Sequence, residues 1–389
     1  MIPQLQHVLP YLDEDSVYGR LKHSEIDQLA DVCLSASYFL DLGWKEKVLN
    51  TAERLLRSRD RNPAMVELRR IALERLYRTP SPEQQVHQLR ELSSQFRPID
   101  ERSNAHFGEM VLLLAHLLVD LTEHQLAVSV LETFKPRDPH RASRLEQVIV
   151  NDVLSIRGQI LRFTGDFVKA RLCFFQLLRR TPTPPKLTTQ LSAVSCELGD
   201  FDYAIGILTD EIKGLQDAGD RMDSLNAKRL RLALADAYLM KAIKLEPSQG
   251  LDGELVERAS GLFGSLAEHF KETDELWKVG KINRFRVLTA LAIIEHLQGN
   301  PRRALERWDA AQAASRKCWS PGHTDMVIMY SKCELMYRLG EHRGAYSLES
   351  EAVRLYQRVG RRYHFTGLGS IWQDHIGNAM KLRGREALG

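Results

Sequence analysis

The sequence has few cysteines, and they form no pattern expected of metal ligands or disulfide pairs. Five cysteines, an odd number, are scattered over 389 residues, and no C-x-x-C pair occurs. Such isolated thiols are typical of a reduced compartment, where most of them pack inside helices. We therefore expect a cytoplasmic protein, with the nucleus as an alternative.

Long hydrophobic runs are also missing. The most apolar stretch, residues 111–121, is short and is interrupted by His116 and Asp120, and the first residues lack a basic flank before an apolar core. A membrane-spanning helix needs about 20 consecutive apolar residues. We expect no signal peptide and no membrane span.

No excess of one charge sign is present, because 54 Lys and Arg face 51 Asp and Glu. A net charge of +3 creates no global field that would recruit nucleic acid. Near the C-terminus, however, basic and aromatic residues alternate, and such a mixture can bind single strands. Its members are Arg354, Tyr356, Arg358, Arg361, Arg362, Tyr363, Phe365, Trp372, Lys381, Arg383 and Arg385. No nucleic-acid motif accompanies them, so we expect solvated arginines and packed aromatic rings, and no nucleic-acid partner.

Motifs for catalysis, metals and nucleotides are absent. There is no G-x-x-x-x-G-K-[S/T], H-E-x-x-H or G-x-S-x-G, and residues 367–369 (Gly-Leu-Gly) lack the third glycine of a dinucleotide site. His116, Asp120 and His124 are spaced four apart, but on one helix the two histidines would lie about 12 Å apart, too far to share an ion. Cys318 and His323 are close in sequence only. We expect no cofactor and no metal site.

The most informative feature that is present is a repeat. Residues 165–170 (Gly-Asp-Phe-Val-Lys-Ala) recur at 199–204 (Gly-Asp-Phe-Asp-Tyr-Ala), displaced by 34 residues. Gly158 lies twelve residues before Ala170, and Phe174 lies four after it. Two closely crossing helices need small residues at their contact and a breaker between them. This spacing resembles the tetratricopeptide repeat (TPR) family of helical hairpins.

The rest of the chain repeats this pattern more weakly. Ala36 lies twelve residues before Val48, with a turn expected at residues 42–43, and Ala115 lies twelve before Ala127, so both indicate degenerate hairpins. Ser81, with Gln84 three residues on, is expected to cap a helix, and a longer helical pair at 222–271 is expected to break at residues 246–253. Gly299 and Gly340 begin similar turns, apolar residues fall at helical spacing, and strand-like alternation is missing. We predict an all-α fold, a right-handed superhelical α-α solenoid of about eight TPR-like hairpins with a C-terminal capping helix. It would form a single solenoid over 1–389, with degenerate repeats at 1–150, the best repeats at 151–218, a long-armed hairpin at 219–284, further repeats at 285–359 and a cap at 360–389.

The resemblance also implies a binding groove. In TPR proteins, positions 2, 5, 9 and 12 of the first helix of each hairpin point into the concave face. The candidates carried over in this way are Asp152, Ser155, Gln159, Arg162, Lys186, Thr189, Arg286, Thr289, His296, Tyr330, Glu334 and Tyr337. Chaperone-binding relatives clamp a carboxylate with Lys at position 5 and Asn at position 9. Here Ser155 and Gln159, then Thr189 and Ala193, stand at those positions, so no chaperone-tail clamp is expected.

The resemblance and the missing catalytic motifs favour a non-enzymatic scaffold or adaptor that holds a protein or peptide in its groove. Two alternatives stay open. One is an enzyme with its active site inside the groove, using His116, His296 or Tyr330 as acid–base groups, because a fold does not exclude chemistry. The other is a regulator that senses a small ligand or peptide, although residues 1–60 show no DNA-binding helix-turn-helix.

Overall fold

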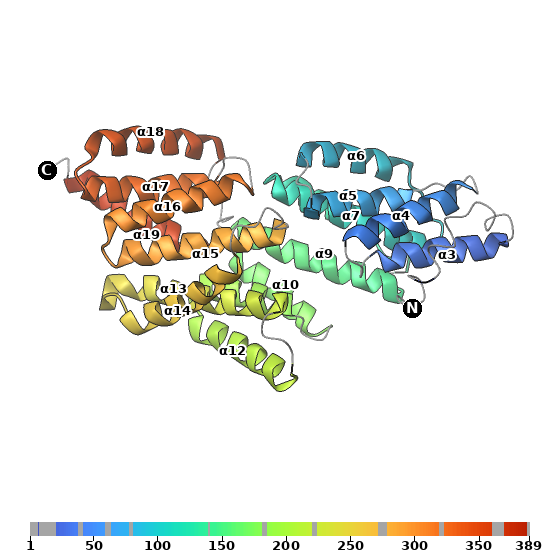
Figure 1. The fold of residues 1–389 in the computed structure, drawn as a ribbon, viewed down its shortest axis with the longest axis horizontal. Coiled ribbons are helices and arrows are strands. Elements are labelled where there is room, and N and C mark those ends of the chain that lie inside the picture. Colours follow the sequence, from blue (N-terminus) through green and yellow to red (C-terminus); the bar gives the residue numbers. More distant parts are fainter. Residues whose placement is uncertain are drawn as a thin grey trace. The chain divides into compact units, whose positions relative to one another are not determined.

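A computed structural model of the chain describes most of its residues. These are residues 7, 21–37, 42–58, 64–77, 81–138, 141–180, 185–219, 224–270, 278–318, 323–359 and 369–386. In these ranges the chain forms seventeen α-helices and no strand, which confirms the predicted all-α class (Figure 1). The chain divides into two compact units, residues 1–152 and 153–389, which are described separately. The expectation of one continuous solenoid over 1–389 stays a prediction.

The first unit consists of helical pairs. Its helices are α3 (His23–Ala36), α4 (Leu42–Arg57), α5 (Ala64–Tyr77), α6 (Pro82–Gln95), α7 (Glu101–Asp120), α8 (His124–Leu131) and the first half of α9 (Arg144–Phe163). The predicted hairpins around Ala36 and Ala115 are present as α3–α4 and α7–α8. Ser81 caps α6 by accepting a hydrogen bond from the Gln84 N–H, as its spacing predicted.

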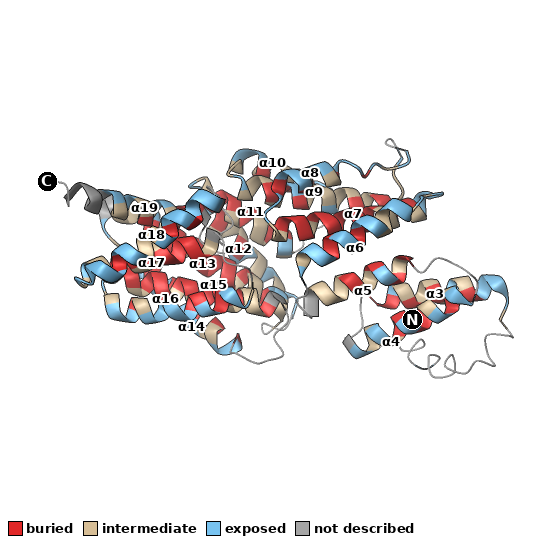
Figure 2. Ribbon diagram, turned by 90° about the horizontal axis from the view of Figure 1, so that it is seen from above, coloured by how far each residue is buried: buried red, intermediate tan, exposed pale blue. Residues whose placement is uncertain are grey.

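The second unit continues with hairpins of the same kind. Its helices are the rest of α9, α10 (Phe167–Leu178), α11 (Pro185–Glu197), α12 (Phe201–Asp217), α13 (Leu225–Gln249), α14 (Gly253–His269), α15 (Lys278–Leu297), α16 (Pro301–Arg316), α17 (His323–Arg338), α18 (His342–Val359) and α19 (Gly369–Glu386). Helix α13 is the centre of this unit, since it packs against α11, α12, α14, α15 and α19. Buried residues accordingly cover most of its surface (Figure 2).

The repeat glycines end the first helix of each hairpin. Gly165, Gly199, Gly299 and Gly340 all have φ between 76° and 87°, a left-handed conformation that glycine adopts without steric cost. At each turn the next residue donates its N–H to a carbonyl five residues back, as Asp166 does to Leu161 at 2.8 Å. The four turns therefore share one helix-ending geometry, and this explains why the six-residue signature recurs in the sequence.

Inside the best hairpin, small and aromatic residues interlock. A Cβ placed on Gly158 of α9 would lie only 2.6 Å from Cε1 of Phe174 on α10. Phe174 and Ala170 are both fully buried. Gly158 is thus required by the close approach of the Phe174 ring, the small-against-large packing that the repeat spacing indicated.

Two sequence-based boundaries need correction. Helix α13 does not break at Glu246 but runs through Pro247 to Gln249 and ends at Gly250. Residues 42–43, expected to form the turn between α3 and α4, instead begin α4. The C-terminal cap is present as α19, which packs on α17 and reaches α13 and α11 as well.

Candidate functional site

The first helices of successive hairpins bring three charged residues to one cavity in the second unit. Arg162 lies at the end of α9, Asp236 in the middle of α13 and Arg286 in α15. The cavity has a volume of about 170 Å³. Its other walls are Thr189, Gln190, Ser192, Ala193, Cys196, Ala233, Ala237 and Met240. Arg162, Thr189 and Arg286, which the repeat positions nominated separately, therefore line a single cavity.

Asp236 and Arg286 form an ion pair at this cavity. Arg286 Nη2 donates to Asp236 Oδ2, and the aspartate is only 5% exposed. Burial raises the pKa of Asp236, while the positive charges of Arg286 and Arg162 oppose that rise. Oδ1 of Asp236 and Nε of Arg286 are buried and have no hydrogen-bond partner among the described residues. Buried polar atoms without partners are costly, so the pair has unused hydrogen-bonding capacity.

Arg162 adds a second cation. Its Nε is also buried and lacks a hydrogen-bond partner within the described part of the chain. Burial lowers the pKa of Arg162, and the carboxylate of Glu197 opposes that change. Of the described charged residues that line the cavity, two are therefore positive and one is negative. Such an arrangement favours an incoming anionic group.

Glu197, which balances Arg162, is also bound to the start of α19. Its carboxylate accepts hydrogen bonds from the Ser370 N–H at 3.2 Å and from the Ser370 hydroxyl at 2.5 Å. Burial raises the pKa of Glu197, and both Arg162 and Ser370 counteract it. Glu197 therefore interacts with both Arg162 and Ser370, and its hydrogen bonds from Ser370 leave Arg162 only partly balanced by this carboxylate.

Three other nominated residues are used for packing or pairing. His296 on α15 and Glu334 on α17 are each 1% exposed, and His296 Nε2 lies 2.8 Å from Glu334 Oε2. Burial raises the pKa of Glu334, but His296 and Arg338 outweigh it and hold the pKa at about 2. Thr289 is buried as well. These buried side chains therefore stabilise the packing of the inner helices.

The remaining candidates are dispersed. Ser155 hydrogen-bonds Gln190 at 3.3 Å, and the Tyr337 hydroxyl donates to Glu349 at 2.7 Å. Lys186 is exposed on α11, Gln159 is half-buried, and Tyr330 lines a different cavity. Asp152 is exposed and belongs to the first unit. Their part in binding stays a proposal.

Sequence reasoning missed Asp236. The long helix α13 carries no repeat signature, so no groove position could be assigned to it. One signal was available: Asp236 is an isolated acid within the apolar run from Leu232 to Met240. Aspartate is rarely buried unless it is paired, which marks such a residue as a member of an ion pair.

The spaced histidines do not lie on one helix. Helix α7 ends at Asp120, whose carboxylate binds Arg75, whereas His124 begins α8. Among the described residues no group of three potential metal ligands comes together. Cys318 follows α16, and the side chain of His323 lies outside the described residues.

The basic C-terminal segment is only partly described. Residues 360–368, which include Arg361, Arg362, Tyr363 and Phe365, lie outside the described ranges. Trp372 is fully buried, so this ring packs in the fold as expected. Arg354 and Arg358 are exposed on α18. Among the helices described, none combines the length and apolarity that crossing a membrane requires.

Comparisons with known proteins show similarity at the level of structure. No protein-family profile and no curated protein sequence matches the chain. A solved structure of a Rap protein complexed with Competence and Sporulation Factor is similar, with a TM-score of 0.55 and 12% identity over 94% of this chain and 99% of that chain.

Two further structures were found. A tetratricopeptide repeat protein from Parabacteroides merdae has a TM-score of 0.43 and 11% identity, covering 91% of this chain and 99% of that chain. Yeast Tom70 has a TM-score of 0.42 and 13% identity, covering 99% and 87%. The likeness to the Rap protein, together with the hairpins described above, shows that the fold is a TPR-like helical solenoid.

Proposed function

We propose that this protein is a non-enzymatic binding module whose groove in the second unit holds a peptide or an extended protein segment with an acidic side chain. The proposal rests on the cavity between α9, α11, α13 and α15, where Arg162 and Arg286 face Asp236, the one acid among the described lining residues. A carboxylate entering the cavity would form charge-assisted hydrogen bonds, which are stronger than neutral ones.

The size of the cavity supports a side chain rather than a whole small molecule. Pockets for small molecules span about 300–1,000 Å³, whereas this cavity holds about 170 Å³. One acidic side chain of a longer segment is an occupant of suitable size. The rest of the segment would lie along the inner helices, where Lys186 is exposed. The Rap protein, which shares the fold, was solved as a complex with a named factor, and that supports a binding role by analogy.

The geometry gives less support to the enzyme alternative. His296 is 1% exposed, is bound to Glu334 and lies edge-on to the Trp372 ring at 5.2 Å. A general base must reach the substrate proton within hydrogen-bond distance. A side chain enclosed in this way is better suited to packing than to proton transfer.

A peptide-display selection tests the proposal. The full chain is panned against phage displaying random peptides, and a selected peptide is then titrated against purified variants. We expect enrichment of Asp and Glu, and at least tenfold weaker binding to the double variant Asp236→Asn with Arg286→Gln. That variant removes one of the two lining cations, Arg286, together with its partner Asp236, so no buried charge is left unpaired, which would itself be destabilising.

A matched control neutralises an ion pair elsewhere in the same unit. Glu254→Gln with Arg258→Gln removes an exposed pair on α14 and should leave affinity unchanged. Circular dichroism and melting curves establish that both double variants are folded. Selection of peptides without acidic residues, or equal binding by all three proteins, would show that the proposed site is wrong.

A further inference from the structure

A groove lies between α16 and α18, the second helices of the last two hairpins, and its floor is formed by α17. Its volume is about 460 Å³. None of the described residues that line it also lines the arginine cavity. We propose that this outer groove binds an extended segment of a second partner protein, in which two basic side chains flank an apolar one.

The floor of the outer groove is apolar. Leu305 of α16, Met336 of α17 and Leu348 of α18 are half-buried and line it. Gly344 widens this floor, because a Cβ there would lie only 2.5 Å from Cε of Met336. The methionine therefore extends over the backbone of α18. Since methionine is flexible and polarizable, it adapts to apolar side chains of different shapes.

The charged residues of the outer groove include two acids without a counter-charge. Lys332 of α17 donates to Asp309 of α16 at 2.6 Å and to Gln312 at 3.2 Å, so this cation is already paired. Glu341 and Glu351 are exposed, and within the described part of the chain neither takes part in a side-chain hydrogen bond or an ion pair. The outer groove is therefore complementary to a positively charged partner.

The spacing of the two acids selects the form of the partner. Glu341 directly precedes α18, and Glu351 lies ten residues further on, inside that helix. At 1.5 Å per residue their backbone positions are about 15 Å apart, too far for one basic side chain to pair with both. In an extended segment, residues four apart lie on one face about 13 Å from each other, and the residue midway faces the same side.

Such a segment matches the outer groove along its length. A Lys or Arg at each end would pair with Glu341 and Glu351, while its apolar stem contacts the floor. The side chain midway would pack on Met336. The geometry thus specifies a partner with two basic residues four positions apart and an apolar residue between them.

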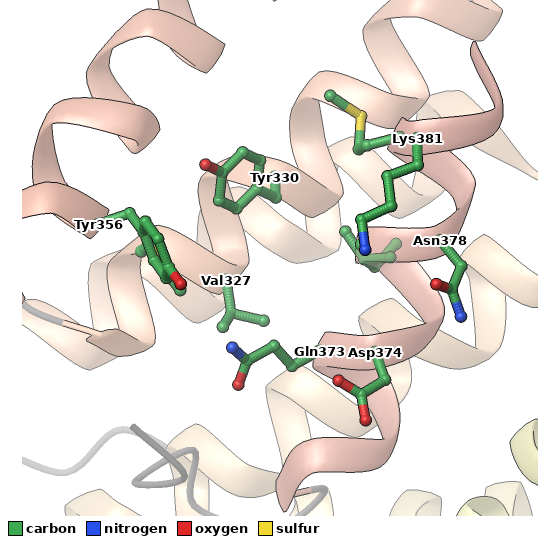
Figure 3. Close-up of a pocket in the computed structure, with 11 residues that line it drawn as sticks. Val327, Tyr330, Tyr356, Gln373, Asp374, Asn378 and Lys381 are labelled. Carbon is green, nitrogen blue, oxygen red and sulfur yellow. The ribbon is translucent and has the colours of Figure 1, made fainter. Parts of the chain in front are cut away.

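The cavity between α17, α18 and α19 does not suit the same partner. Figure 3 shows Tyr330 and Tyr356 on one side of it and Lys381 on the α19 side. A basic side chain entering there would meet the like charge of Lys381, which disfavours binding. The outer groove is therefore the better site for a basic segment in the last two hairpins.

A subtractive peptide-display selection tests the proposal. Phage that display random peptides are first depleted on Glu341→Gln with Glu351→Gln and then selected on the native full chain. We expect the selected peptides to carry two basic residues four apart with an apolar residue midway. In calorimetric titration one such peptide should bind the double variant about tenfold more weakly than the native protein. Selected peptides without basic residues, or equal binding by the two proteins, would overturn the proposal.

A matched control removes the same charge elsewhere. Glu257→Gln with Glu306→Gln neutralises exposed acids of α14 and α16 that do not line the outer groove. This variant should bind the selected basic peptide as tightly as the native protein. An equal loss in both double variants would mean that the peptide responds only to net charge, and that result would contradict a site in the groove.

A filled-groove variant locates the binding. Ser347 is exposed on α18 and lines the outer groove, so Ser347→Trp should block it and abolish binding. Gln357→Trp, at an exposed position of the same helix outside the groove, should preserve binding. Circular dichroism establishes that both variants are folded. Unchanged affinity of folded Ser347→Trp would place the peptide elsewhere.

A final comparison separates the outer groove from the arginine cavity. Glu341→Gln with Glu351→Gln should bind a selected acidic peptide as tightly as the native protein does, because the two sites share no described lining residue. Loss of acidic-peptide binding together with basic-peptide binding would show a general effect on the second unit and would contradict an independent site.

Discussion

The turn of each hairpin depends on a single residue with positive φ. Thr122 differs from the others because it is not a glycine. Four turns of the second unit use glycine with positive φ, but Thr122, between α7 and α8, has φ 63°. The same hydrogen bond closes this turn, from the Glu123 N–H to the Leu118 carbonyl at 2.8 Å. A β-branched residue pays a steric cost in this conformation that glycine avoids.

We predict that Thr122→Gly stabilises the first unit by about 1 kcal/mol, the usual cost of a left-handed non-glycine residue. Chemical denaturation followed by circular dichroism measures the change. Ser129→Gly, at an exposed position inside α8, is the control and should destabilise the same unit. A destabilising Thr122→Gly would show that the strain is absent.

Gly158 carries the tightest packing in the best hairpin. Gly158→Ala would place a methyl group 2.6 Å from the Phe174 ring, and we predict a loss of about 1–3 kcal/mol of stability. Gly261→Ala, on α14 with open space around it, should instead be neutral or stabilising. Thermal melts of both variants measure the difference, and equal melting temperatures would contradict the contact.

At the scale of elements, α19 packs into the core of the second unit through an aromatic cluster around Trp372. The Trp372 ring stacks on Trp308 and on His375 and meets His296 edge-on. Burial lowers the pKa of both histidines; Glu334 opposes the change at His296, and Glu246 and then Glu334 oppose it at His375. Both imidazoles are therefore harder to protonate in the folded protein than in the unfolded chain.

This burial gives a pH dependence with a definite sign. Because each folded-state pKa lies below its unfolded value, near 6.5, the unfolded chain binds more protons as the pH falls, and stability decreases from pH 7.5 to 5.5. Glu197 and Asp236, whose pKa values burial raises, contribute in the opposite direction. A comparison of variants is therefore needed.

We predict that His375→Gln loses stability less steeply than the native protein between pH 7.5 and 5.5, since it removes one of the buried bases. Urea denaturation at several pH values gives the two slopes. Glu334, with its pKa at about 2, stays ionised throughout this range and therefore does not contribute to the difference between the two slopes. Identical slopes would mean that His375 is protonated equally in both states.

At the scale of the molecule, the sequence predicted the hairpins well because each depends on local signals. Turn glycines, small contact residues and Phe174 recur at fixed spacing, and the structure uses them for turns and close packing. The end of α13 was predicted wrongly because Pro247 usually breaks a helix. Here Gly250 donates to the Glu246 carbonyl at 2.9 Å, so the last turn closes beyond the proline.

The candidate site was predictable only in part. Repeat positions identified Arg162, Thr189 and Arg286, because inner helices stack in register. They could not identify Asp236, since α13 has no repeat signature, nor the pairing of His296 with Glu334, which depends on contacts 38 residues apart. Local patterns thus indicate which helix face is inside, while charge pairing is decided by tertiary packing.

The central claim, that an acidic side chain of a bound segment enters the arginine cavity, is tested most directly by a double-mutant cycle. A selected peptide and its Glu→Gln or Asp→Asn counterpart are titrated against the native protein and against Asp236→Asn with Arg286→Gln. We predict that either change alone weakens binding at least tenfold and that both together cause little further loss, because they remove one interaction. Fully additive losses would show that the acidic group binds elsewhere and would contradict the account.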